Sequence, residues 1–227
     1  MAKENYINLV FVIDESGSMY SSTNDVIGGF KSTIEEQKKE TEGKCTVSLY
    51  KFNDTVKEVY LGKDVNEITD LDYIANSVTA MNDGIGTAID KVGKWLSDMN
   101  EEDRPSKTLV VIMTDGAENA SKEYSFDRVK EMIKHQEEKY NWTFMYMGTD
   151  ITSMKDVKSL GIKMSAFSSR KDFASNYSVV NEATKMYRTL KADAYTASAT
   201  MDAFLSTSAN EMTAKYETEN NIKITNL

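Results

Sequence analysis

The sequence has little of three residues that often carry chemistry or constrain a fold. Its 227 residues include one cysteine, Cys45, one histidine, His135, and one proline. A single cysteine excludes an intrachain disulfide and is typical of proteins from a reducing cytoplasm. We expect His135, in the charged run KEMIKHQEEK, to face solvent, and Cys45 has no evident base partner. The sequence therefore lacks the nucleophile and base that a serine or cysteine hydrolase needs.

Long apolar runs and an excess of positive charge are also absent. No apolar stretch approaches the ~20 residues of a membrane span, and the short apolar run near the N-terminus has no signal-peptide cleavage site. The formal net charge is −9 and the isoelectric point is about 4.8. An acidic chain argues against a broad surface for nucleic acid or anionic lipid. We therefore expect neither a nucleic acid nor a membrane as partner.

The remaining sequence alternates strand and helix patterns. Strands are predicted at 6–13, 46–52, 55–61, 108–113, 142–147 and 162–166. Helices are predicted at 25–40, 80–99, 126–139, 153–160 and 172–190, while 68–77 is either irregular or a short helix. This order predicts an α/β fold with a Rossmann-like, doubly wound, mostly parallel six-stranded sheet and helices on both faces. The short turn before 55–61 makes that edge strand antiparallel.

We expect one domain over residues 1–190 and a separate C-terminal extension over residues 191–227. The extension is rich in Ala, Ser and Thr, and its thin apolar stripe predicts a weakly amphipathic helix followed by a polar tail. Two interpretations remain open. The helix packs back on the domain, or it serves oligomerisation or docking.

One predicted strand ends in an aspartate that is followed by two serines, in the run VFVIDESGSM (residues 10–19). Asp14, Ser16 and Ser18 place one carboxylate and two hydroxyls on a tight loop, and Gly17 lets this loop curl around a small ion. Such hard oxygen ligands suit Mg²⁺ or Mn²⁺ better than zinc, which prefers nitrogen and sulfur. The alternative is an ordinary strand-to-helix turn with Ser18 as the N-cap.

A second buried strand, LVVIMTDG (residues 109–116), also ends in an aspartate, Asp115. Parallel strands that end side by side bring such residues to the carboxyl edge of the sheet, where open α/β folds usually bind ligands. Thr79 precedes a helical apolar pattern, so its hydroxyl is free to face this edge. Thr87 is the alternative threonine, but it falls in the middle of the predicted helix.

These polar residues resemble, in type and order, the metal-ion-dependent adhesion site (MIDAS) of a von Willebrand factor A (VWA) domain. The matching residues are Asp14, Ser16, Ser18, Thr79 and Asp115. The resemblance covers about residues 5–190 and is closest to small VWA proteins of bacteria and their phages. Further matching runs are IGGF at 27–30, TDGAENAS at 114–121 and VKEMIKHQEEKY at 129–140. Ser77 departs from the pattern, because the family often has glycine at this position.

The resemblance implies a Mg²⁺ or Mn²⁺ ion held by these five side chains, some of them through water. A carboxylate of a partner protein can then fill an open position on the ion. We therefore expect a metal-dependent protein-binding module, not an enzyme, in the cytoplasm of a bacterium and encoded by the bacterium or a phage. One alternative is a structural or assembly subunit in which the metal only stabilises the fold. Another is Mg²⁺-dependent phosphoryl transfer on Asp14, although that chemistry commonly uses a second carboxylate where this chain has Ser16.

Four acidic or amide side chains lie close to the predicted ligands in the sequence. We expect Glu15 to point away from the ion into solvent, because alternate residues after a strand face opposite ways. Glu118 and Asn119 either hydrogen-bond the ligands or begin a helical turn. Asp83 faces either the site or solvent.

Overall fold

The structure is a computed structural model that describes residues 3–148, 157, 159–162, 164–167, 173–189 and scattered positions between 200 and 218. Its elements are β1 (Lys3–Asp14), η1 (Gly17–Ser22), α1 (Thr23–Lys39), β2 (Lys44–Phe52), β3 (Val56–Asp64), η2 (Val65–Glu67), α2 (Met81–Ser97), η3 (Glu101–Asp103), β4 (Pro105–Met113), α3 (Phe126–Tyr140), β5 (Thr143–Gly148), β6 (Met164–Phe167) and α5 (Phe173–Thr189). The short helix predicted at 153–160 and most of the segment 191–227 lie outside the described residues.

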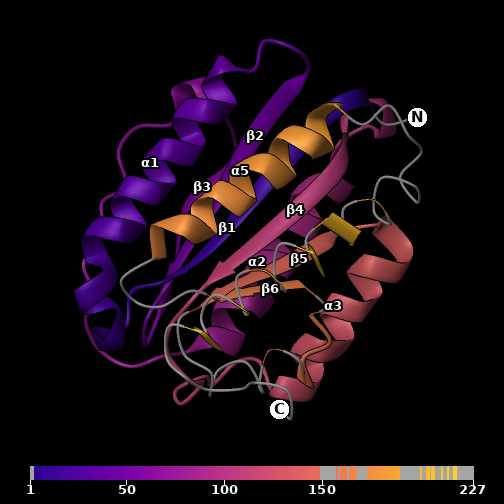
Figure 1. Ribbon diagram of the computed structural model, residues 1–227. Coiled ribbons are helices and arrows are strands. Elements are labelled where there is room, and N and C mark those ends of the chain that lie inside the picture. The colour runs from indigo at the N-terminus through magenta and orange to yellow at the C-terminus, as the bar shows by residue number, and fades with distance from the viewer. Residues whose placement is uncertain are drawn as a thin grey trace.

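The described strands form one six-stranded sheet in the order β3-β2-β1-β4-β5-β6 (Figure 1). β1 runs parallel to both β2 and β4, and β5 runs parallel to β4 and β6. The edge strand β3 is antiparallel to β2. The predicted mixed, doubly wound sheet is therefore confirmed. The strand order reverses between β1 and β4, and ligands of such sheets bind outside the carboxyl ends of the strands at this switch point.

β1 is apolar on both sides because helices cover both faces of the sheet. Leu9, Phe11 and Ile13 belong to one buried cluster, and Val10 and Val12 belong to the other. Alternate side chains of a strand point to opposite faces, so this one strand contributes to two cores. A continuous apolar run is the pattern that a central parallel strand requires.

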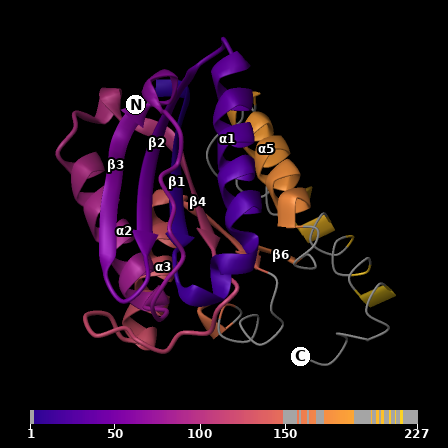
Figure 2. The same cartoon turned by 90° about the vertical axis from the view of Figure 1, so that its left-hand side faces the viewer.

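The helices lie in two layers, with α1 and α5 over one face and α2 and α3 over the other (Figures 1 and 2). α1, α2, α3 and α5 begin and end within two residues of the predicted bounds. The chain between η2 and α2 has neither helix nor strand, which was one of the two expected alternatives. None of the described helices is long and apolar enough to span a membrane.

α1 and α5 approach closely at Gly29. A Cβ atom on Gly29 would lie 1.9 Å from Cδ2 of Tyr177, so only glycine leaves room for this ring. The Tyr177 hydroxyl donates a hydrogen bond of 3.0 Å to the carbonyl of Val26. Phe204, a described position in the C-terminal extension, packs against the same buried cluster as α1 and α5.

Candidate metal site

Asp14 is the last residue of β1 and is completely buried at the carboxyl edge of the sheet. β1 and β4 are parallel neighbours in register, so Thr114 and Asp115 follow β4 beside Asp14. Oδ1 of Asp14 accepts a hydrogen bond of 2.6 Å from the backbone nitrogen of Ser16. Oδ2 accepts one of 2.5 Å from the Thr114 hydroxyl. These two bonds fix the orientation of the Asp14 carboxylate.

The two serine hydroxyls lie next to one another. Ser16 Oγ and Ser18 Oγ are 3.1 Å apart. Ser16 is buried, whereas Ser18 is exposed, so the pair reaches from the interior to the surface. The N-cap positions of η1 and α1 are Ser16 and Ser22, and neither makes a side-chain capping bond. The alternative in which Ser18 is only a helix N-cap is therefore wrong.

Gly116 lies where the predicted ligand segments meet. A Cβ atom at this position would lie 2.9 Å from Thr79 Oγ1, 3.2 Å from Ser18 Oγ and 3.5 Å from Asp14 Oδ2. Three predicted ligand oxygens, two from the end of β1 and the loop after it and one from the segment before α2, therefore border one small space beside the loop after β4, which we call the Gly116 space. Thr79 reaches it because it precedes α2, whereas Thr87 lies within that helix.

Two buried carboxylates stand close together at this edge of the sheet. The pKa of Asp14 is raised from 3.8 to about 6, chiefly by burial and to a smaller extent by the charge of Asp115. Hydrogen bonds from Thr114 and Ser16 act in the opposite direction. Asp115 itself is only 2% exposed. A bound cation would favour the charged form of Asp14 and so lower this pKa.

The loop after β4 holds Thr79 in place. Asn119 Oδ1 accepts a hydrogen bond of 3.0 Å from the backbone nitrogen of Thr79, and the Thr79 carbonyl accepts bonds from the backbone nitrogens of Asn119 and Ala120. Glu118 accepts a bond of 2.8 Å from the backbone nitrogen of Asn82. Neither Glu118 nor Asn119 lies in a helix. Asn119 therefore has the expected hydrogen-bonding role toward a predicted ligand, whereas the bonds of Glu118 go to Asn82, Ala120 and Ser121.

Asp83 faces neither the site nor solvent. Its carboxylate is almost completely buried and accepts hydrogen bonds of 2.8–2.9 Å from the backbone nitrogens of Lys122, Glu123 and Tyr124. It thereby joins the first turn of α2 to the chain that leads into α3. Both expected positions of Asp83 are wrong, because a buried carboxylate is satisfied here by backbone donors.

Glu15 makes a nearly buried ion pair with Lys51 of β2. Lys51 Nζ donates to Glu15 Oε1 at 2.7 Å and to the carbonyl of Asp72 at 2.5 Å. The same Glu15 oxygen accepts a bond of 3.1 Å from the backbone nitrogen of Ile74. The Glu15 side chain is only 13% exposed, so the expectation that it lies in solvent is wrong.

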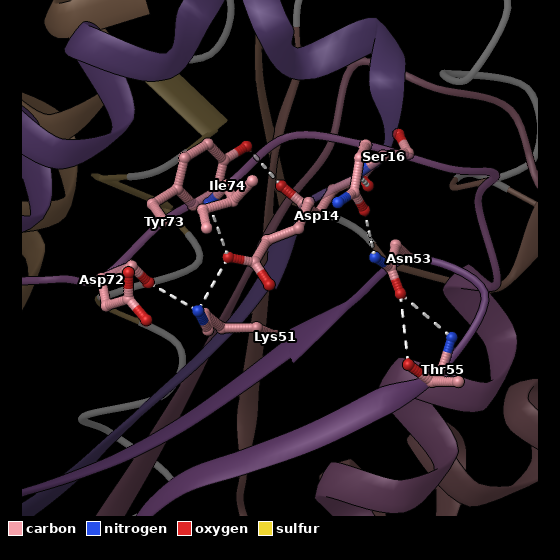
Figure 3. A network of polar contacts seen from close by, with 10 residues as sticks. Asp14, Ser16, Lys51, Asn53, Thr55, Asp72, Tyr73 and Ile74 are labelled. Carbon is pink, nitrogen blue, oxygen red and sulfur yellow. Dashed lines mark hydrogen bonds and ion pairs between the residues drawn. The ribbon is translucent and has the colours of Figure 1, made fainter.

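The irregular segment before Thr79 is also bonded to the end of β1. The buried Tyr73 hydroxyl donates a hydrogen bond of 2.6 Å to the carbonyl of Asp14 (Figure 3). The backbone nitrogen of Asn76 donates one of 2.7 Å to the carbonyl of Glu15. The segment that carries Thr79 is therefore fixed to the strand that carries Asp14.

Ser77 has a left-handed backbone, with φ of 68°. Its carbonyl accepts a hydrogen bond of 3.0 Å from the backbone nitrogen of Gly17, which joins the two loops of the site. Glycine adopts this conformation without steric cost, which gives a physical reason for the glycine at this position in the VWA pattern. With Ser77 in place of glycine, the loop is still bonded to Gly17, but the serine adopts a backbone conformation that is unfavourable for a residue with a Cβ atom.

Sequence reasoning missed three residues that support the predicted ligands. Thr114, which bonds Asp14, stands in the run TDG and could have been found there. Lys51 and Tyr73 carry no motif, and their positions depend on contacts between segments that are distant in the sequence.

The chemistry of the site fits a hard divalent cation. In the described part of the chain, no group of three or more His, Cys, Asp or Glu side chains could hold a metal ion. An ion at this edge would therefore depend on hydroxyls together with two carboxylates, and hydroxyl and carboxylate oxygens suit Mg²⁺ and Mn²⁺. The exposure of Ser18 leaves one side of the site accessible from solvent.

Solved structures with the same fold include several with low sequence identity. Proximal thread matrix protein 1 from the mussel byssus, with a zinc-occupied MIDAS motif, has a TM-score of 0.57 and 14% identity, covering 78% of this chain and 47% of that chain. A von Willebrand factor type A structure from Catenulispora acidiphila has a TM-score of 0.55 and 15% identity, covering 81% and 43%. Manganese-loaded TRAP protein from Plasmodium vivax has a TM-score of 0.51 and 16% identity, covering 75% and 71%.

At these identities the likeness concerns the fold alone. The chain spans about half the length of the mussel and Catenulispora structures. A search of curated proteins found no match. The family model described as "von Willebrand factor type A domain" matches residues 8–189, which is most of the sequence, and the chain therefore belongs to that family.

Proposed function

We propose that this VWA domain is a metal-dependent protein-binding module. A Mg²⁺ or Mn²⁺ ion would be held by the five predicted side chains, Asp14, Ser16, Ser18, Thr79 and Asp115. The observation that carries the proposal is the Gly116 space, because predicted ligand oxygens from the end of β1 and the loop after it and from the segment before α2 meet there, next to Asp115. A carboxylate of a partner protein would complete the coordination of the ion.

The balance of charge supports a role in binding an acidic group. The two carboxylates can at most neutralise the ion, and the three hydroxyls add no charge. Mg²⁺ gives up its waters reluctantly, so some of these side chains would act through water. An ion that keeps an accessible position next to the exposed Ser18 can attract an external carboxylate.

Two solved structures with this fold also support the proposal. The mussel protein is described with a zinc-occupied MIDAS motif, and the Plasmodium protein is described as manganese-loaded. Divalent ions thus occur in domains of this fold. The choice of Mg²⁺ or Mn²⁺ for this chain rests on its oxygen ligands.

We assign no catalytic step to the site. Both carboxylate oxygens of Asp14 accept hydrogen bonds, and Ser16 stands where phosphoryl transfer commonly uses a second carboxylate. His135 is exposed on α3 and Cys45 is buried in β2, so neither offers a base or nucleophile beside the ligands. A stable beryllofluoride adduct at Asp14 would contradict this assignment.

We further propose a bacterial cytoplasm as the setting, with the gene in the bacterium or a phage. Support comes from the sequence resemblance and from the single cysteine, Cys45. Fractionation of the native cell tests the location directly.

Calorimetric titration with Mg²⁺ and Mn²⁺ tests the metal site, and a pulldown with Mg²⁺ or EDTA tests partner binding. Asp14→Asn keeps the size of the side chain but removes its charge, so we expect loss of ion binding and of the partner. The control is Asp98→Asn, which changes an exposed carboxylate at the end of α2. A partner retained equally in EDTA would contradict the proposal. Metal-induced stabilisation without any metal-dependent partner would favour the structural alternative.

A further inference from the structure

Three large exposed apolar side chains lie on the segments that carry the predicted metal ligands. In the described part of the chain, four large apolar or aromatic residues are exposed, namely Tyr20 (77%), Ile74 (65%), Val78 (47%) and Tyr140 (60%). The first three lie on the segments that carry the predicted ligands, whereas Tyr140 ends α3. We call Tyr20, Ile74 and Val78 the apolar rim.

The rim residues are tied to the ligands by short stretches of chain. Tyr20 follows Ser18 by two residues within η1, and Val78 directly precedes Thr79. The hydrogen bond from the backbone nitrogen of Gly17 to the carbonyl of Ser77 joins these two segments at 3.0 Å. Tyr20 and Val78 are therefore displayed on adjoining loops beside the hydroxyl ligands.

Ile74 is held on the same loop by its backbone. Its nitrogen donates to Glu15 Oε1 at 3.1 Å, and this carboxylate is itself paired with Lys51 (Figure 3). The preceding residue, Tyr73, is buried and bonded to Asp14. The loop thus directs one aromatic side chain inward and presents the next apolar side chain to solvent.

We infer that the partner is a protein segment in which an Asp or Glu side chain is flanked by apolar residues, and that the apolar rim receives those residues while the ion receives the carboxylate. The inference rests on the proposed metal-dependent function. Single exposed apolar residues are ordinary on a protein surface, but a group of them around a ligand site is typical of an interaction surface. A central polar contact with surrounding aromatic and aliphatic contacts is a common arrangement of binding energy in interfaces.

The division of roles explains how such a site would select one partner. Any accessible carboxylate satisfies the charge of the ion, so the ion alone distinguishes acidic from neutral side chains. The rim adds a preference for apolar neighbours of the acid, because their burial removes apolar surface from water on both molecules. The structure therefore assigns charge recognition to the ion and sequence preference to Tyr20, Ile74 and Val78.

A peptide selection tests the inference. Phage-displayed peptides with a fixed central Glu and random flanks are selected in Mn²⁺ on the wild type and on the triple variant Tyr20→Ser, Ile74→Ser, Val78→Ser. We expect apolar flanks among the wild-type binders.

The triple variant is expected to bind a selected peptide about tenfold or more weakly. Its Mn²⁺ affinity should match the wild type, because no predicted ligand is changed. Tyr140→Ser, an equally exposed change remote from the ligands, is the matched control and should bind normally.

Several results would overturn the inference. These are polar flanks among the selected peptides, equal binding by the triple variant, or no selected peptide although Mn²⁺ binds. Rim-dependent cosedimentation with phosphatidylserine vesicles in Mn²⁺ would also overturn it, because it would assign the rim to a lipid surface. Absence of Mn²⁺ binding by the wild type in calorimetry would instead reject the proposed function itself.

Discussion

Lys51 and Glu15 form a nearly buried ion pair next to the end of β1, with 2.7 Å between Lys51 Nζ and Glu15 Oε1. The same ammonium group donates to the carbonyl of Asp72, so the pair connects β1 and β2 to the segment that leads to Thr79. Breaking a buried pair by removing one partner is costly because the remaining charge stays poorly solvated. The pair is therefore important both for the fold and for the position of a predicted ligand.

Replacing Lys51 tests this role. Lys51→Met should lower the free energy of unfolding by roughly 3 kcal/mol, because Glu15 is left without its cation. We also expect weaker Mn²⁺ binding, because the Thr79 segment loses the donor at Asp72. Urea denaturation and calorimetric titration measure the two effects separately.

An exposed lysine serves as the control. Lys94→Met breaks the exposed pair with Asp98 and should change stability by less than about 0.5 kcal/mol. Adding Glu15→Gln to Lys51→Met should recover part of the lost stability, because no unpaired charge remains. Equal effects of Lys51→Met and Lys94→Met would contradict the role assigned to the buried pair.

Gly116→Ala should abolish Mn²⁺ binding without removing any ligand. The added methyl group would lie 2.9 Å from Thr79 Oγ1 and would occupy the Gly116 space. Gly28→Ala is the control, because a Cβ atom there meets nothing within 4 Å. Within α1 this change should stabilise the protein by about 1 kcal/mol. Calorimetry that finds unchanged Mn²⁺ affinity for Gly116→Ala would place the ion elsewhere.

Ser77→Gly should raise the free energy of unfolding by roughly 0.5–1 kcal/mol. Ser77 has φ of 68°, a left-handed conformation that is unfavourable for residues with a Cβ atom. Ser77→Ala keeps the Cβ atom and should give no such gain. Thermal denaturation of the three proteins in EDTA measures the effect without a contribution from the metal. Equal midpoints for the glycine and alanine variants would show that the loop carries no strain at this position.

The sequence was sufficient to predict the sheet and the edge of the sheet at which Asp14, Asp115 and Thr79 lie, since both depend on local patterns. Apolar runs that end in Asp14 and Asp115 identify parallel strands, and parallel strands end at one edge. The helical spacing after Thr79 predicts that its hydroxyl precedes α2, and the structure agrees. These features needed no knowledge of side-chain contacts between distant segments.

The supporting contacts could not be predicted in this way. The alternation of side chains after a strand predicts the side to which Glu15 points, but it does not predict which residue lies there. That residue is Lys51, which is 36 residues away in the sequence. Asp83 was misplaced for the same reason, since its donors come from a loop about 40 residues later. Strand and helix periodicity predicts burial, but it does not specify which buried polar groups meet.

Cys45 should be unreactive in the folded protein. Burial raises the pKa of its thiol from 9.0 to about 12, so almost no thiolate, the reactive form, is present at neutral or mildly alkaline pH. Ellman's reagent should label the thiol only as fast as the protein unfolds, and completely in denaturant. The single cysteine makes the signal unambiguous. Rapid labelling of the native protein would show that this end of β2 opens readily.

The raised pKa of Cys45 also predicts a dependence of stability on pH. The neutral thiol is favoured in the folded state, so its contribution is complete below about pH 9 and is lost as the pH rises toward 12. Cys45→Ala should remove this part of the slope, which is measured as the difference between the two denaturation curves across the alkaline range. Parallel curves would contradict burial of the thiol.

The ring of Tyr177 over Gly29 restricts the motions that are open to α5. On the same face of α1, one turn before and one turn after Gly29, Val26 and Thr33 carry buried side chains, so the ring has no equivalent gap along the helix. The Tyr177 hydroxyl also lies 3.4 Å from Sδ of Met113, at the carboxyl end of β4. Translation of α5 along α1 would first require this ring to withdraw from the interior. This contact opposes a slide of α5 along α1 and so helps to hold α5 in axial register with the strand that leads into Asp115.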